Sequence, residues 1–83
     1  KGPRGVWGLG IEVRGGQAPL EVEVLDIGGN VVGRARLTRP NRFSLKIPQS
    51  VSKVTVQVTD AAGQVLRVPA EASAPSALID LGG

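Results

Sequence analysis

A basic segment is the part of this chain best suited to bind a ligand. Six basic residues and no acidic residue fall between positions 34 and 53, so the overall charge of +3 is concentrated there. Guanidinium forks and amines bind phosphates, sulfates and carboxylates. If adjacent strands gathered five of these groups on one side, they would form a basic face: Arg34, Arg36, Arg39, Arg42 and Lys46. This face is the candidate binding site, and nucleic acid or another polyanion is its candidate ligand.

Aromatic side chains are scarce, which weakens the nucleic-acid hypothesis. Proteins that bind single strands stack bases on aromatic rings, and this chain has only Trp7 and Phe43. Phe43 is in phase with Leu45 and Ile47, so we expect it in the core. Trp7 stands near Gly5 and Gly8, where an exposed ring would offer an aromatic contact to a sugar or a partner. The single Trp of a small sandwich is more often a core residue.

Ser50 and Lys53 have the spacing of the Ser-x-x-Lys pair of penicillin-recognising enzymes. That chemistry needs the serine at the start of a helix, because the lysine one turn later then reaches its hydroxyl. Here the pair leads into alternating valines, and residues three apart in a strand point to opposite faces. The partner motifs Ser-Asp-Asn and Lys-Thr-Gly are also missing. We therefore expect a solvated loop.

Glu21 and Glu23 are the other candidate acid pair. Along one face of a strand they would lie about 6–7 Å apart, a separation that a glycosidase uses. Both have arginine partners in the hairpin expected over residues 20–37, so we expect them to be ion-paired residues on an open, solvated sheet face. The chain also has no Cys, His, Met or Tyr, which excludes thiolate and imidazole chemistry. We expect no catalytic residue, no cofactor and no enzyme activity. We also expect no metal site, and the alternative is a single calcium ion held by Asp60 and backbone carbonyls.

The hydrophobic period is two, which indicates strands that are buried on one face. Apolar residues alternate with polar ones in 20–26, 42–47 and 53–59, and clusters of Gly, Pro, Asn and Asp separate the segments. The predicted strands span 6–14, 20–27, 31–37, 42–47, 53–59, 64–68 and 78–81. This spacing predicts an all-β fold, a single antiparallel β-sandwich of about seven short strands.

One hairpin can be tested by its register. A two-residue turn at Gly28-Gly29 would pair Glu23 with Arg34 and Glu21 with Arg36. Opposite charges then meet on one face and apolar groups meet on the other. A slip of one residue would bury the charges, so the pattern specifies the register. A four-residue loop would leave the same residues on each face of the hairpin but would pair Glu23 with Arg36.

The length of 83 residues predicts one domain, 1–83. Because the chain begins with Lys1, we expect a module processed or excised from a longer chain. No apolar run approaches the roughly 20 residues of a membrane span, so no membrane insertion is expected. Seven Arg against three Lys is typical of a thermophilic or high-GC source. The oligomeric state stays open.

Three segments carry a family resemblance: Pro19-Leu-Glu-Val-Glu-Val-Leu-Asp26, Arg42-Phe-Ser-Leu-Lys-Ile-Pro48 and Val54-Thr-Val-Gln-Val-Thr-Asp-Ala-Ala-Gly63. They resemble bacterial immunoglobulin-like repeats and carboxypeptidase-regulatory (transthyretin-like) domains. Leu37-Thr-Arg-Pro-Asn-Arg-Phe43 with Ile47-Pro48 is similar to a segment of the AMIN domains of cell-envelope proteins. The resemblance implies an immunoglobulin-like or transthyretin-like sandwich without catalytic residues.

The function that this resemblance implies is that of an accessory module. Such a module would belong to a bacterial exported or cell-envelope protein, in an extracellular or periplasmic location. It would act in spacing, docking or protein–protein interaction. Its partners would be neighbouring domains of the parent chain or another protein. The alternative is a small basic β-domain that binds nucleic acid or another polyanion through residues 34–46.

Overall fold

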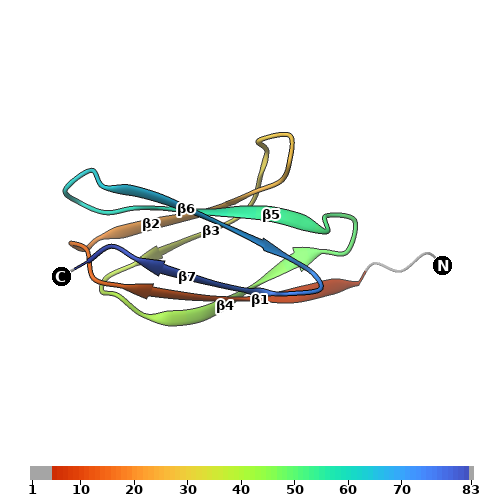
Figure 1. The fold of residues 1–83 in the computed structure, drawn as a ribbon, viewed down its shortest axis with the longest axis horizontal. Coiled ribbons are helices and arrows are strands. Elements are labelled where there is room, and N and C mark those ends of the chain that lie inside the picture. The colour runs from red at the N-terminus through yellow and green to blue at the C-terminus, as the bar shows by residue number, and fades with distance from the viewer. Residues whose placement is uncertain (1–4, 83) are drawn as a thin grey trace.

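Seven strands form the whole regular structure of residues 5–82, the part of the chain that this computed structural model describes (Figure 1). No helix occurs among these residues. The predicted all-β sandwich of seven strands is therefore confirmed. In chain order the strands are β1 (Val6–Arg14), β2 (Leu20–Leu25), β3 (Val31–Leu37), β4 (Arg42–Pro48), β5 (Lys53–Thr59), β6 (Val65–Glu71) and β7 (Ser76–Asp80).

The strands divide into two sheets that pack face to face. Sheet A has three strands in the order β4-β1-β7, and sheet B has four in the order β3-β2-β5-β6. Figure 1 shows the two sheets as layers, with the β2–β3 loop projecting away from the body. The chain stays within sheet B at the β2–β3 and β5–β6 hairpins and changes sheet at every other connection. β3 and β4 follow each other in the sequence, but β3 is an edge strand of sheet B and β4 is an edge strand of sheet A.

Alternation along the strands builds the core, as the hydrophobic period predicts. In β5 every second residue is buried, and the same holds for β7. β-Branched residues fill much of the space between the sheets because they fit a pleated surface well. The fully buried large side chains come from both sheets: Leu9, Ile11, Leu20, Val22, Val24, Ile47, Val56, Val58 and Ile79. Within the described part of the chain, Figure 1 shows no element outside these two layers that could cover their outer faces.

The β2–β3 hairpin has the register that its charges predict. Glu23 lies opposite Arg34 and Glu21 opposite Arg36, with Val22 opposite Ala35. The turn itself differs from the predicted Gly28-Gly29 dipeptide. β2 ends at Leu25, five loop residues come next, and a register shift beside Val24 absorbs the extra residue. The bulge keeps the charged rows aligned although the loop is longer.

The side chain of Asp26 explains the longer loop. Its Oδ1 accepts hydrogen bonds from the N–H groups of Asn30 and Gly28, both at 2.9 Å. Such a carboxylate replaces the backbone partners that a tight turn would use. The bonds, led by the one from the Asn30 N–H, hold the pKa of Asp26 below its ordinary value. Gly29 has φ +84°, a conformation that glycine adopts without steric cost.

One pair of neighbouring strands is parallel, in contrast to the antiparallel sandwich predicted. β1 and β7 run side by side from Gly10↔Ser76 to Arg14↔Asp80. Parallel neighbours need a long crossover connection. Here the whole of β2 to β6 provides it, which is why local sequence patterns could not reveal the pairing. As a result, the chain enters β1 at one end of the sandwich and leaves β7 at the opposite end (Figure 1).

The sixth strand is longer than predicted. The sequence predicts its end at residue 68, before Pro69, but β6 continues through Pro69 to Glu71. Pro69 is tolerated because β6 is the edge strand of sheet B, where a residue can lack its N–H without losing a ladder hydrogen bond. The last strand also begins earlier than predicted, at Ser76.

Candidate interaction surfaces

The structure divides the basic segment between two faces. Arg34 and Arg36 are exposed residues of β3, on the outer face of sheet B. Arg42 and Lys46 are exposed residues of β4, on the outer face of sheet A. Gly33 of β3 faces the interior of the sandwich, because a Cβ at this position would contact side chains of β4 in the other sheet. The two pairs therefore point away from each other, and no single basic face forms from these four residues.

Arg34 and Arg36 already have acidic partners. Nη2 of Arg34 lies 3.6 Å from Oε2 of Glu23, and Nε of Arg36 lies 3.3 Å from Oε2 of Glu21. Both arginine side chains stay well exposed, at 70% and 67%. Pairs of this kind contribute about 0.2–1 kcal/mol each. Glu21 and Glu23 thus form ion pairs across the β2–β3 hairpin, as predicted from the sequence.

The remaining basic residues have different surroundings. Arg39 is exposed in the connection between β3 and β4. Arg42 lies opposite Glu12 of β1, but the carboxylate of Glu12 contacts Nε of Arg14 at 2.8 Å. Lys46 lies opposite Gly8, which offers no side chain. The residues around Arg39, Arg42 and Lys46 do not form a common site in which the three cations could hold one anion.

Trp7 lies in the core. Its residue surface is 9% exposed, and its indole Nε1–H donates to the carbonyl oxygen of Val51 at 2.7 Å. The bond ties β1 to the connection between β4 and β5. The buried indole has its polar group satisfied, which is the usual condition for a buried Trp. Stacking on a sugar or a partner would need the exposed ring that this arrangement does not present.

Asp60 is the one buried charged residue among residues 5–82, at 5% exposed. Its carboxylate accepts four hydrogen bonds: from the Gln17, Ala62 and Gln64 N–H groups and from the Gln64 side-chain amide, over 2.8–3.0 Å. These bonds, with the one from the Gln17 N–H as the largest contribution, lower the pKa of Asp60. Asp60 thus joins the β1–β2 connection to the β5–β6 turn. All its bonds are internal, so we assign it a structural role.

Ser50 and Lys53 show no catalytic arrangement. Ser50 is an exposed turn residue. Lys53 is the first residue of β5 and lies opposite Glu71 of β6 in the strand register. The serine does not begin a helix, which is the feature that the Ser-x-x-Lys chemistry requires. Residues 5–82 also contain no group of three acidic side chains placed to hold a metal ion.

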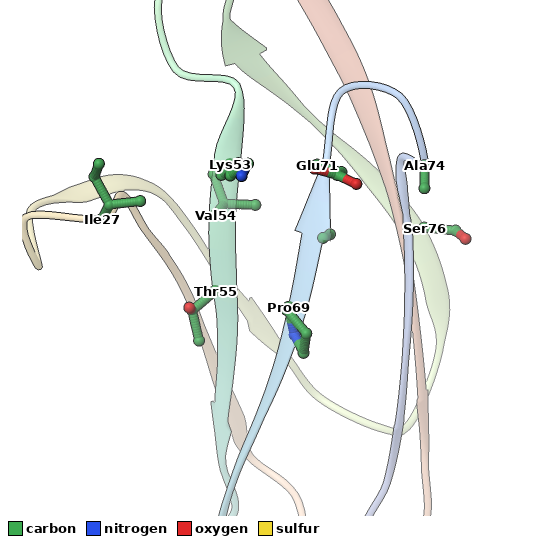
Figure 2. Close-up of a pocket in the computed structure, with 9 residues that line it drawn as sticks. Ile27, Lys53, Val54, Thr55, Pro69, Glu71, Ala74 and Ser76 are labelled. Atoms are coloured by element: carbon green, nitrogen blue, oxygen red, sulfur yellow. The ribbon is translucent and has the colours of Figure 1, made fainter.

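A groove that the sequence did not reveal lies where β5 begins and β6 ends, between the β2–β3 loop and the start of β7. It has a volume of about 490 Å³, and Figure 2 shows Ile27 on one side, Ala74 and Ser76 on the other, and Thr55 and Pro69 between them. Ile27 is 91% exposed. The signal in the sequence is an isoleucine inside the turn Asp-Ile-Gly-Gly-Asn, where no strand pattern gives it a core position. Lys53 and Glu71, which lie opposite each other in the β5–β6 register, are the only charged residues that line the groove, and its other seven lining residues are uncharged.

Comparisons of this chain with family models, curated proteins and solved structures give no match. Residues 5–82 also include no helix with the length and apolarity of a membrane span. The fold and its surfaces are therefore the basis on which a function can be inferred.

Proposed function

We propose that this chain is a non-enzymatic accessory module that spaces or docks its neighbours. The parallel pairing of β1 with β7 is the observation that supports this function most strongly. It directs the chain into the sandwich at one end and out at the other. Nine residues of β1 span about 30 Å at the rise of an extended strand. A domain with this connectivity keeps its two neighbours in the parent chain a fixed distance apart.

The strand order bears on the proposed family. In the antibody constant domain, the first, second, fifth and fourth strands form one sheet, and the third, sixth and seventh form the other. This chain has β3-β2-β5-β6 and β4-β1-β7. The order thus differs from that of the antibody constant domain, and of the two resemblances we keep the transthyretin-like one as our proposal. With that resemblance we propose that the parent is an exported or cell-envelope bacterial protein, and that the partners are neighbouring domains or another protein.

The alternative function, polyanion binding through residues 34–46, receives less support from the geometry. The cationic side chains of β3 and β4 point away from each other, and those of β3 have acidic partners. An NMR titration with a short duplex, at low and at physiological salt, tests this alternative. Shifts at Arg34, Arg36, Arg39, Arg42 and Lys46 that survive physiological salt would favour it over the accessory function.

A distance measurement tests the spacing function directly. Fuse one small folded domain to each end of the chain, each with a single spin label, and measure the distance between the labels. As a control, replace the module by a Gly/Ser linker of equal residue number, which behaves as a flexible coil. We expect a narrow distribution with the module and a broad one with the linker. Equally broad distributions would reject the spacing function.

A further inference from the structure

The edge of β3 is open to a further strand over residues 33–37. Edge strands expose unpaired backbone groups, and proteins protect them with charged side chains, Pro, β-bulges or a short length. On β3 the register shift lies before residue 33, and the charged residues are Arg34 and Arg36. β6 contains Pro69, β7 has only five residues, and β4 contains Lys46 and ends at Pro48. β3 has seven residues and contains neither Pro nor Lys. Among residues 5–82, its only strand partner is β2.

Pro69 fixes the direction of the backbone groups across sheet B. A proline has no N–H, so its pair with Thr55 cannot be a hydrogen-bonded pair of the antiparallel ladder. The N–H and C=O of Thr55 therefore point the other way, toward Leu25 of β2. Backbone groups alternate in direction along a strand, so those of Glu23, two residues before Leu25, also point toward β5.

The same alternation determines which way the backbone N–H and C=O groups of β3 point. Because the backbone of Glu23 bonds toward β5, its pair with Arg34 on the other side is not hydrogen-bonded. Arg34 and Arg36 therefore direct their N–H and C=O groups to the free edge. The β2–β3 loop gives the same result independently. The Asp26 N–H donates to the Asn30 carbonyl at 2.9 Å, so Asp26, an odd number of residues from Glu23, bonds toward β3.

Arg34 and Arg36 also present charge at this edge. Each guanidinium has five N–H donors, and the one carboxylate beside each leaves donors for a second. A strand added at the edge would place side chains directly opposite these two arginines, on the same outer face. Acidic residues at alternate positions would complement them.

The inner side of the same edge offers apolar contacts. Val32 and Ala35 of β3, and Phe43 and Leu45 of the neighbouring β4, pack against the core but remain partly exposed. The alternate residues of an added strand would point toward them. Backbone bonds, outer charge and inner apolar surface therefore specify one pattern, in which acidic and apolar residues alternate. β2 has this pattern on the opposite side of β3, as Leu20-Glu-Val-Glu-Val-Leu25.

We propose that the β3 edge is a docking site for an extended segment of a partner protein in which acidic and apolar residues alternate, bound as an additional strand of sheet B. This inference rests on the proposed accessory function and specifies its partner. A second copy fits less well, because antiparallel pairing of β3 with itself about its two arginines sets Arg against Arg. Like charges directly opposite each other destabilise a strand pair.

A peptide with the sequence of residues 19–26, capped at both ends, serves as the probe. The readout is backbone hydrogen exchange of the labelled chain with and without peptide. We expect the peptide to slow exchange at the amides of Arg34 and Arg36. The amide of Ala35, which already bonds to β2, should not change. A peptide of the same composition with its two glutamates adjacent, and one with Lys for both glutamates, should bind more weakly.

Matched variants separate the edge from general charge effects. Arg34→Gln with Arg36→Gln should weaken peptide binding about 2- to 30-fold, the effect of losing two exposed cross-strand ion pairs. Arg67→Gln removes one positive charge from β6, the edge that contains Pro69, and should leave binding within about twofold. The single variants Arg34→Gln and Arg36→Gln match it in charge and should each weaken binding more than Arg67→Gln does. These substitutions are at exposed positions, and the fold of each variant can be checked by circular dichroism.

Three results would overturn the docking proposal. The first is unchanged exchange at Arg34 and Arg36 at saturating peptide. The second is equal binding of the lysine peptide. The third is protection of both amides in the chain alone that rises with protein concentration, which would assign the edge to a second copy. The spacing measurement uses no peptide, so the docking proposal and the spacing function can fail separately.

Discussion

Asp60 shows how one carboxylate can connect two distant parts of the chain. Gln17 and Gln64 lie in different connections, and both donate to it. The backbone adds a further bond here, from the Ala61 N–H to the Gln17 carbonyl at 2.7 Å. A buried acceptor with four donors would leave unpaired donors behind if it were removed, which costs more than the bonds themselves contribute. Asp60 is therefore a residue on which the ends of four strands depend.

The lowered pKa of Asp60 predicts acid-dependent stability. The folded state holds the ionised form, so its pKa lies below the unfolded value of about 3.9. The stabilisation is fully present above the unfolded pKa and is lost as the pH falls through the folded pKa. We expect Asp60→Asn to lower the unfolding midpoint at pH 7 and to reduce the fall in stability below about pH 4.

Urea unfolding of both proteins between pH 7 and pH 2.5 measures this effect. Asp26, whose pKa is also lowered, keeps its own acid dependence in the variant and serves as the internal reference. An Asp60→Asn protein as stable as the parent at pH 7, with the same acid response, would contradict the structural role of Asp60.

Strand pairing is the level at which the sequence was most informative. Glu21 and Glu23 specify the β2–β3 register because only one register keeps both charges outside and opposite arginines. That constraint is local and can be read from alternation alone. The loop could not be predicted in the same way, because its length depends on hydrogen bonds that Asp26 makes only in the folded turn.

The location of the basic residues needed information that alternation does not contain. Alternation places Arg34 and Arg42 on the outer faces of their strands, as the structure shows. It does not say that β3 and β4 belong to different sheets, because a short connection can close a hairpin or cross between sheets. The predicted basic face depended on that choice. The exposed Ile27 is a second example, since turn residues lack a period from which exposure could be inferred.

Exchanging the charges of Glu23 and Arg34 measures how much this cross-strand pair contributes to the stability of the β2–β3 register. Glu23→Arg alone sets two arginines opposite each other and should destabilise the hairpin. Glu23→Arg combined with Arg34→Glu restores opposite charges in the same register. A double-mutant cycle from urea unfolding should give a coupling free energy of about 0.2–1 kcal/mol. Salt should reduce it, because both side chains are exposed. A coupling of zero at low salt would mean that the pair contributes nothing to the register.

At the scale of the whole molecule, the sandwich combines local hairpins with one long-range pairing. The hairpins β2–β3 and β5–β6 join strands that are neighbours in sequence. The β1–β7 pairing joins the first strand to the last and closes sheet A. Patterns along the sequence predicted the number of strands and their exposed faces. They could not predict the strand order, because the order is decided by which strands meet after the chain has folded.

The parallel β1–β7 pairing also determines how the domain should respond to mechanical force. Pulling on the two ends draws β1 and β7 in opposite directions along their length. The interstrand hydrogen bonds from Gly10↔Ser76 to Arg14↔Asp80 are then loaded together, in shear. Pulling Lys53 away from Glu71 instead opens the β5–β6 ladder from one end, so its bonds break one after another. Because the chain has no cysteine, introduced cysteine pairs define both directions in single-molecule force spectroscopy. We expect the higher unfolding force for end-to-end pulling, and equal forces would contradict it. In the spacing function that we propose, this arrangement would let the domain resist tension along the line that joins its two ends.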